Sequence, residues 1–129
     1  MRSVDTNVLV RFLTHDDPEQ TPRAVAFFEE RTSDDPAFVS LVVLAELYWV
    51  LTAAYDFDPR AVVEQIENLS GSDEIVTEQP AVVHAAIAAT KRGAGFADAL
   101  IHGIAARSGC TDTVTFDGRA ARHLGLALL

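Results

Sequence analysis

Short runs of β-branched and other apolar residues alternate with longer helical patterns along the whole chain, and this alternation constrains the fold more than any other feature. We expect short strands near residues 3–5, 37–39, 74–77, 113–116 and 126–129. We expect helices over about residues 6–14, 41–55, 59–70, 80–92, 96–107 and 118–123. A further helix should follow the Asp16-Asp17-Pro18 break and end at about Arg31. Strands separated by helices are typical of an α/β protein with a mostly parallel sheet and helices on both faces.

Local signals fix several of these boundaries. Ser40 is a candidate cap for the long apolar helix that follows it, and Pro59 suits the first position of the next helix. Gly71 ends that helix, and Val62, Ile66 and Leu69 form its apolar face. The run 93–95 (Gly-Ala-Gly) is a hinge-like break between two helices.

The length and composition predict one compact domain over residues 1–129. A hydrophobic share of 49% excludes global disorder, and the single cysteine excludes a disulfide framework or a multi-cysteine zinc site. The longest apolar stretch, residues 37–55, carries Glu46 at its middle, which argues against a membrane span. Without a signal peptide or disulfides, we expect a cytoplasmic protein.

The acidic balance argues against simple binding to nucleic acid. The chain has 19 Asp and Glu against 10 Lys and Arg, a formal net charge of −9. Nucleic-acid binding is dominated by cations that contact phosphate, so a polyanionic substrate would need metal ions or a local arginine cluster here. A basic partner is an equally good interpretation of the charge.

Four acidic residues stand where solubility does not require them. Asp5 ends an apolar strand, and Asp117 follows another. Glu46 is the sole charge in its apolar stretch, and Asp98 is the sole charge between Arg92 and Arg107. Carboxylates in apolar surroundings are costly unless they are paired, hydrogen-bonded or bound to a metal.

Oxygen ligands without cysteine suit Mg²⁺ or Mn²⁺, which usually complete their coordination with substrate phosphate oxygens. The matching chemistry is phosphodiester hydrolysis, in which the metal lowers the pKa of a bound water. The alternative is four separate structural roles. Asp5, Asp98 or Asp117 could each serve as a helix cap, whereas Glu46 has no capping position.

Polar neighbours suit a supporting role around these acids. Thr6 and Asn7 follow Asp5 directly, and Thr115 precedes Asp117 by two residues. Each can orient a carboxylate or a water, although Thr6 or Asn7 can equally cap the first helix. His102 lies one helical turn after Asp98 and could be a ligand, a general acid or a packing residue.

Four segments, each containing one of the four acids, resemble the PIN-domain family and in particular the VapC-type toxins of toxin–antitoxin pairs. The matching segments are residues 4–9 (VDTNVL), 43–51 (VLAELYWVL), 96–101 (FADALI) and 115–117 (TFD). Their order and spacing match, and the resemblance covers essentially the whole chain.

The resemblance implies a three-layer α/β/α sandwich around a parallel five-stranded sheet. It implies a Mg²⁺- or Mn²⁺-dependent endoribonuclease with Asp5, Glu46, Asp98 and Asp117 as its acidic quartet. Asp5 and Asp98 would be the most direct metal ligands, with Glu46 and Asp117 as further ones. It also implies a homodimer that hydrolyses RNA and is neutralised by a small VapB-like antitoxin.

Three other functions remain open at the level of sequence. The chain could be a non-catalytic PIN-like module that only binds a protein partner, against which the four intact acids argue. A phosphoaspartate mechanism needs a lysine at a later strand end, and the only lysine, Lys91, is predicted inside a helix. Metal-free cleavage by histidine needs two cooperating acid–base residues. The apolar stretch near residues 41–55 and the pair Phe27 and Phe28 could form a groove for a partner helix, or could equally pack the core and the dimer contact.

Overall fold

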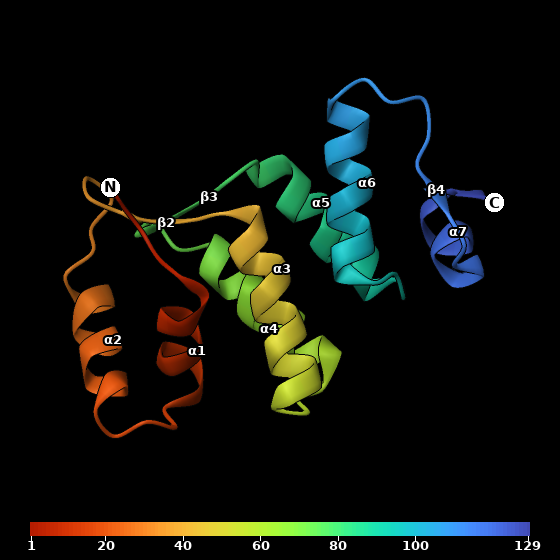
Figure 1. Cartoon of the computed structure of the whole chain (residues 1–129). Helices are drawn as coiled ribbons and strands as arrows, with labels where there is room; N and C mark the ends of the chain where they lie inside the picture. The colour runs from red at the N-terminus through yellow and green to blue at the C-terminus, as the bar shows by residue number, and fades with distance from the viewer. The chain divides into compact units, whose positions relative to one another are not determined.

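The computed structural model describes all 129 residues and divides into two compact units, Met1–Glu78 and Gln79–Leu129 (Figure 1). The first unit comprises β1 (Arg2–Ser3), α1 (Thr6–Thr14), α2 (Gln20–Glu29), β2 (Ala37–Val39), α3 (Leu41–Trp49), the π-helix η1 (Val50–Ala54), α4 (Pro59–Ser70) and β3 (Ile75–Thr77). The second comprises α5 (Pro80–Lys91), α6 (Phe96–Arg107), β4 (Val114–Thr115), α7 (Gly118–Leu124) and β5 (Ala127–Leu128). The predicted α/β class is confirmed, and none of the helices has the length and apolar character needed to cross a membrane.

The sheet of the first unit has the order β1-β2-β3, and both pairings are parallel. Ser3 lies opposite Phe38, and Phe38 lies opposite Val76. Because the strands run in the same direction, the residues that follow them emerge at one edge of the sheet. Asp5 therefore follows β1 at the same edge at which Ser40 follows β2.

Apolar side chains at helical spacing fill the core of the first unit. Leu44 and Leu47 of α3 are fully buried, as is Leu9 of α1. The predicted apolar face of α4 is confirmed, since Val62, Ile66 and Leu69 are all buried. Ser40 caps α3 as predicted, because its hydroxyl accepts a hydrogen bond from the Val43 amide at 3.2 Å.

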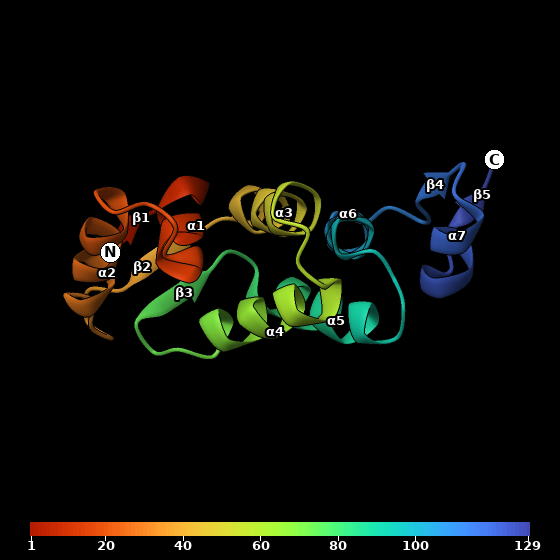
Figure 2. The ribbon, with the colours of Figure 1, turned by 90° about the horizontal axis from the view of Figure 1, so that it is seen from below.

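In the second unit, α5 and α6 pack side by side (Figures 1 and 2). The apolar face of α5 is buried at Val83, Ala86 and Ile87. Gly103 permits the close approach of α6, since a Cβ atom there would lie 2.9 Å from Cγ1 of Val82. Further along the chain, β4 pairs with β5 in parallel, with Val114 opposite Ala127.

The structure contains the five predicted strands, and all their pairings are parallel as expected. It does not contain the single five-stranded sheet that the family resemblance implied. The strands form a three-stranded sheet in the first unit and a two-stranded sheet in the second. Both β4 and β5 span only two residues. Such short strands offer few ladder hydrogen bonds, and those of β4 are directed to β5.

The apolar helix expected to run to residue 55 changes character before its end. Regular α-helix stops at Trp49, and a π-helical turn continues over Val50–Ala54. The hydroxyl of Thr52 donates to the carbonyl of Tyr48 at 2.7 Å, which is the side-chain to backbone contact that disturbs helices at serine and threonine.

A polar network joins the end of α1 to the end of this π-helical turn. Nη1 of Arg11 donates to Oδ1 of Asp16 and to the hydroxyl of Tyr55, both at 3.1 Å. The Tyr55 hydroxyl donates to Oδ2 of Asp16 at 2.5 Å, and the Thr14 hydroxyl donates to Oδ1 at 2.7 Å. The hydrogen bond from Tyr55, with that from Thr14, lowers the pKa of Asp16 to about 2.

We expect Tyr55→Phe to raise the pKa of Asp16 from about 2 toward its ordinary value of 3.8, because the substitution removes the strongest hydrogen bond to the ionised carboxylate. A carboxyl with a depressed pKa stabilises the fold above its ordinary pKa and loses that contribution as the pH falls through its folded value. An NMR titration of the Asp16 carboxyl carbon measures the midpoint. An unchanged midpoint in Tyr55→Phe would contradict the network.

Candidate functional site

Asp5 begins helix α1 directly after the strand β1. Its backbone is extended, and its Oδ1 accepts a hydrogen bond from the Thr6 amide at 2.9 Å, so it caps the helix. Its other oxygen, Oδ2, makes no hydrogen bond or ion pair within the protein. Asp5 and Asn7 are exposed, whereas Thr6 is buried.

Glu46 is exposed on α3 and makes no hydrogen bond or ion pair. The neighbouring Leu44 and Leu47 turn into the core. Val42 and Trp49 lie one turn before and after Glu46 on the same face and are 75% and 65% exposed. The structure therefore gives Glu46 no stabilising role, which agrees with its lack of a capping position in the sequence.

Asp98 lies in the first turn of α6 and is half-buried. A carboxylate there interacts favourably with the positive end of the helix dipole. Its Oδ2 lies only 2.7 Å from the position that a Cβ atom would take on Gly95. The carboxylate thus folds back over Gly95, and it has no hydrogen-bonding or charged partner in the protein.

Asp117 caps α7 through one oxygen. Its Oδ1 accepts hydrogen bonds from the amides of Arg119 at 2.8 Å and Ala120 at 3.2 Å. The Asp117 amide donates to the hydroxyl of Thr115 at 3.0 Å, so the predicted supporting residue contacts this acid. Oδ2 of Asp117 has no partner in the protein.

The structure places two of the four acids in each unit: Asp5 and Glu46 in the first, Asp98 and Asp117 in the second. Neither unit holds a group of three or more histidine, cysteine, aspartate or glutamate side chains arranged for a metal ion. The expectation that these acids are buried is wrong for Asp5, Glu46 and Asp117, which are exposed. Asp5 and Asp117 begin helices, and Glu46 lies on the outer face of α3. Residues that are apolar in the adjoining sequence do not enclose side chains at these positions.

The chemistry of these side chains suits a hard divalent cation. All four are carboxylates, and each has at least one oxygen without a hydrogen-bonding or charged partner in the protein. Carboxylate oxygens are the ligands that Mg²⁺ and Mn²⁺ prefer. Close to Asp98 in sequence, the buried Nδ1 of His102 also lacks a hydrogen-bond partner.

Sequence reasoning missed the structural importance of two glycines, which it interpreted only as a hinge. Gly95 has an ordinary backbone conformation (φ −72°, ψ 138°), and its missing side chain is what lets the Asp98 carboxylate approach. Gly93 adopts φ 105°, a conformation that favours glycine, and the imidazole of His123 lies against it. Their separation by one alanine was the available signal.

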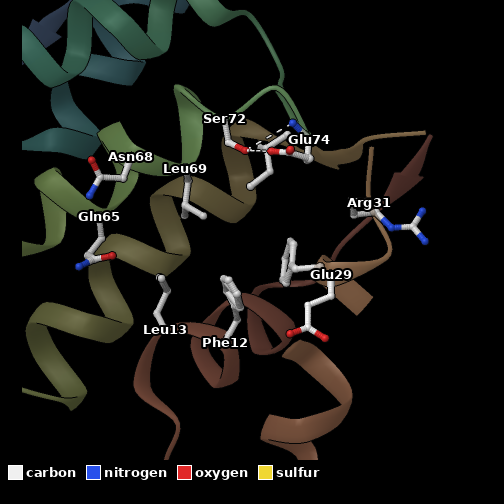
Figure 3. A pocket seen from close by; sticks show the side chains of 11 residues that line it. Phe12, Leu13, Glu29, Arg31, Gln65, Asn68, Leu69, Ser72 and Glu74 are labelled. Carbon is white, nitrogen blue, oxygen red and sulfur yellow. Dashed lines mark hydrogen bonds between the residues drawn. The ribbon is translucent and has the colours of Figure 1, made fainter. Parts of the chain in front are cut away.

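A pocket of about 470 Å³ lies in the first unit, and neither Asp5 nor Glu46 lines it (Figure 3). Its apolar lining includes Phe12, Leu13, Phe28 and Leu69. Glu74, hydrogen-bonded to the Ser72 hydroxyl, adds charge to the lining, as do Glu29 and Arg31. Phe28 therefore lines a hollow and Phe27 stacks with Arg31, but no residue of the stretch 41–55 lines this pocket.

The fold and site define an α/β protein in which Asp5 and Asp117 begin helices that follow parallel strands, at the strand ends where ligands bind in such folds. The sequence matches the PIN domain family over residues 3–125, and the chain belongs to this family. PIN domains are generally nucleases, and they typically use divalent metals. No curated protein matches the chain significantly.

Gly95 leaves room for the Asp98 carboxylate, whereas Gly93 adopts a positive φ, and we expect Gly95→Ala and Gly93→Ala to separate these two roles. Alanine at position 95 keeps an allowed backbone, and the end of the Asp98 side chain can rotate away, so the free energy of unfolding should change by less than about 0.5 kcal/mol. Alanine at position 93 must adopt a left-handed conformation and should cost about 1 kcal/mol or more. Chemical denaturation measures both values.

The carboxyl chemical shift of Asp98 provides the second readout. It should move in Gly95→Ala and stay close to its wild-type value in Gly93→Ala. Equal destabilisation by both substitutions, with no movement of the Asp98 signal, would contradict the close contact.

Proposed function

We propose that the protein is a Mg²⁺- or Mn²⁺-dependent endoribonuclease that acts as the toxin of a type II toxin–antitoxin pair of the VapC type. The observation that carries the nuclease proposal is the state of Glu46 and Asp98, whose carboxylates have no partner in the protein. Asp5 and Asp117 cap helices through one oxygen and keep the other free, so all four acids have an oxygen available to a metal ion.

In this proposal, Asp5 and Asp98 are the most direct ligands, and Glu46 and Asp117 complete the acidic quartet. A bound divalent ion supplies an activated water and stabilises the charge that develops on the scissile phosphate. Helix capping orients Asp5 and Asp117, since each is fixed through Oδ1 and keeps Oδ2 available. Thr115 holds the backbone of Asp117, and Gly95 leaves room for Asp98.

We further propose that a small VapB-like antitoxin neutralises the protein by docking an apolar helical segment in the pocket lined by Phe12, Leu13, Phe28 and Leu69. The apolar lining with charged side chains around it supports this, because amphipathic helices bind in such grooves. Exposed apolar side chains on α3, Val42 and Trp49, support a homodimer as the active assembly.

A non-catalytic PIN-like module that only binds protein is the competing function. It predicts that the wild type does not cleave RNA above background and that substitution of the four carboxylates changes nothing in the cleavage assay. Cleavage by histidine without a metal is a second competitor, and it predicts cleavage that survives EDTA.

We expect wild-type protein to cleave single-stranded RNA in Mg²⁺ or Mn²⁺ and to lose that activity in EDTA. Glu46→Gln and Asp98→Asn should each reduce the cleavage rate by more than about 100-fold, because they remove candidate ligands. Glu46→Gln should change the free energy of unfolding by less than about 0.5 kcal/mol, since Glu46 makes no contact that the amide would lose. Gel assays of RNA and denaturant unfolding measure the two quantities.

Matched controls separate charge loss at the site from charge loss elsewhere. Glu64 is an exposed glutamate on α4, and Asp58 caps α4 through Oδ1, as Asp5 caps α1. Asparagine also caps helices well, so Asp5→Asn and Asp58→Asn should both stay folded. Only Asp5→Asn should lose activity. Wild-type cleavage by Glu46→Gln, or resistance of cleavage to EDTA, would refute the proposal.

The toxin role has its own test. Expression of the wild-type chain in bacteria should arrest growth, and expression of Glu46→Gln should not, because the arrest depends on RNA cleavage. Co-expression of the small protein encoded beside its gene should restore growth. Normal growth with active wild-type enzyme in the cells would contradict the toxin role while leaving the nuclease proposal intact.

A further inference from the structure

The charge of the chain is divided unequally between the two units. The first unit carries 16 Asp and Glu against five Arg, a net charge of −11. The second carries three Asp against five Lys and Arg, a net charge of +2. The overall charge of −9 therefore conceals a cationic second unit, which is the unit that holds Asp98 and Asp117.

Two of the five arginines in the first unit form ion pairs with carboxylates, whereas no arginine in the second unit does. In the first unit, Arg11 pairs with Asp16 at 3.1 Å and Arg31 pairs with Asp35 at 2.7 Å. In the second unit, Arg92, Arg119 and Arg122 form no ion pair with any carboxylate. Their positive charge is therefore not neutralised within the protein.

Arg92 and Arg119 lie at the turn between α5 and α6, and Arg122 extends toward the start of α7. Arg92 directly precedes Gly93, and Nη2 of Arg119 donates to the Gly93 carbonyl at 3.2 Å. The His123 ring lies against Gly93, with Cε1 3.0 Å from where a Cβ atom would be. Nη1 of Arg122 lies 3.7 Å from the position that a Cβ atom would take on Gly118, one turn earlier on α7 and next to Asp117.

Asp98 lies just after the same turn, and Asp117 is linked to the turn through Arg119. The Asp98 carboxylate folds over Gly95, which is at most about 7 Å along the chain from Gly93. The Arg119 amide donates to Asp117, so the residue that reaches the turn also contacts the second acid. Unneutralised guanidinium groups thus flank two candidate metal ligands.

We propose that Arg92, Arg119 and Arg122, with His123 beside them, bind the phosphate backbone of the RNA strand and hold it next to Asp98 and Asp117. This inference rests on the proposed nuclease function and assigns its substrate-binding residues. A guanidinium offers five N–H donors in a geometry that matches phosphate oxygens, and Arg119 uses one of its donors on Gly93. Local cations of this kind are what an otherwise acidic protein needs to bind a polyanion.

The test is binding of a fluorescently labelled single-stranded RNA to the full chain in EDTA, measured by anisotropy over a series of salt concentrations. Each phosphate contact adds about 0.7 to the slope of log K against log salt for a single strand. The double variant Arg92→Gln/Arg122→Gln should therefore reduce the slope by about 1.4 and weaken binding. Arg92→Lys/Arg122→Lys should keep most of the slope.

A control variant removes the same charge elsewhere. Arg107 ends α6, about 16 to 17 Å along the helix from Phe96, and Arg60 is exposed on α4 in the first unit. Arg60→Gln/Arg107→Gln should leave the slope within about 0.3 of the wild-type value, which is under half of one phosphate contact. Equal slopes for the wild type and the Arg92/Arg122 variant would overturn the inference, as would equal loss in both double variants.

Two further outcomes keep this inference separate from the nuclease proposal. If polyglutamate displaces the RNA as effectively as unlabelled RNA does, the face binds an acidic protein segment and the inference is wrong. If the slope falls as expected but the wild type does not cleave RNA in Mg²⁺ or Mn²⁺, the RNA-binding residues are supported and the proposed nuclease function fails. If the wild type cleaves and the slopes are equal, the nuclease stands without this site.

Discussion

The parallel pairing of β1 with β2 and of β2 with β3 is the interaction on which the first unit depends. The register that sets Ser3 opposite Phe38 also sets the positions after both strands at one edge of the sheet. At that edge Asp5 and Ser40 each accept a hydrogen bond from a backbone amide of the helix they begin. Strand pairing therefore fixes where α1 and α3 start, and with them where Asp5 and Glu46 lie.

Helix capping and metal binding are compatible roles for the same carboxylate. Asp5 and Asp117 use one oxygen for backbone amides, and the other remains without a partner in the protein. A cap fixes the carboxylate before any ion arrives, which lowers the entropic cost of ordering a ligand. Glu46 differs, because it contributes to neither a cap nor an ion pair, and it is therefore the residue that best separates a structural from a functional explanation.

Local features of this fold could be predicted from the sequence, and long-range ones could not. Helix α1 and strand β2 begin and end where their residue patterns place them, because caps and apolar spacing act within a few residues. The division of the strands into two sheets depends on pairing between distant segments, which no local pattern encodes. The exposure of Glu46 and the approach of Asp98 to Gly95 depend on how side chains are oriented in the folded chain. The hydrogen bond between Arg11 and Tyr55 joins residues 44 positions apart, so no local pattern predicts it.

The central proposal is that Asp5, Glu46, Asp98 and Asp117 all take part in binding divalent metal. Mn²⁺ is paramagnetic, so a bound ion broadens the NMR signals of nearby carboxyl groups, and a titration with less than one equivalent tests the claim directly. The account predicts that the carboxyl signals of all four acids broaden together while those of Asp58 and Glu64 remain sharp. Broadening confined to the acids of one unit, or distributed over unrelated carboxylates, would contradict it.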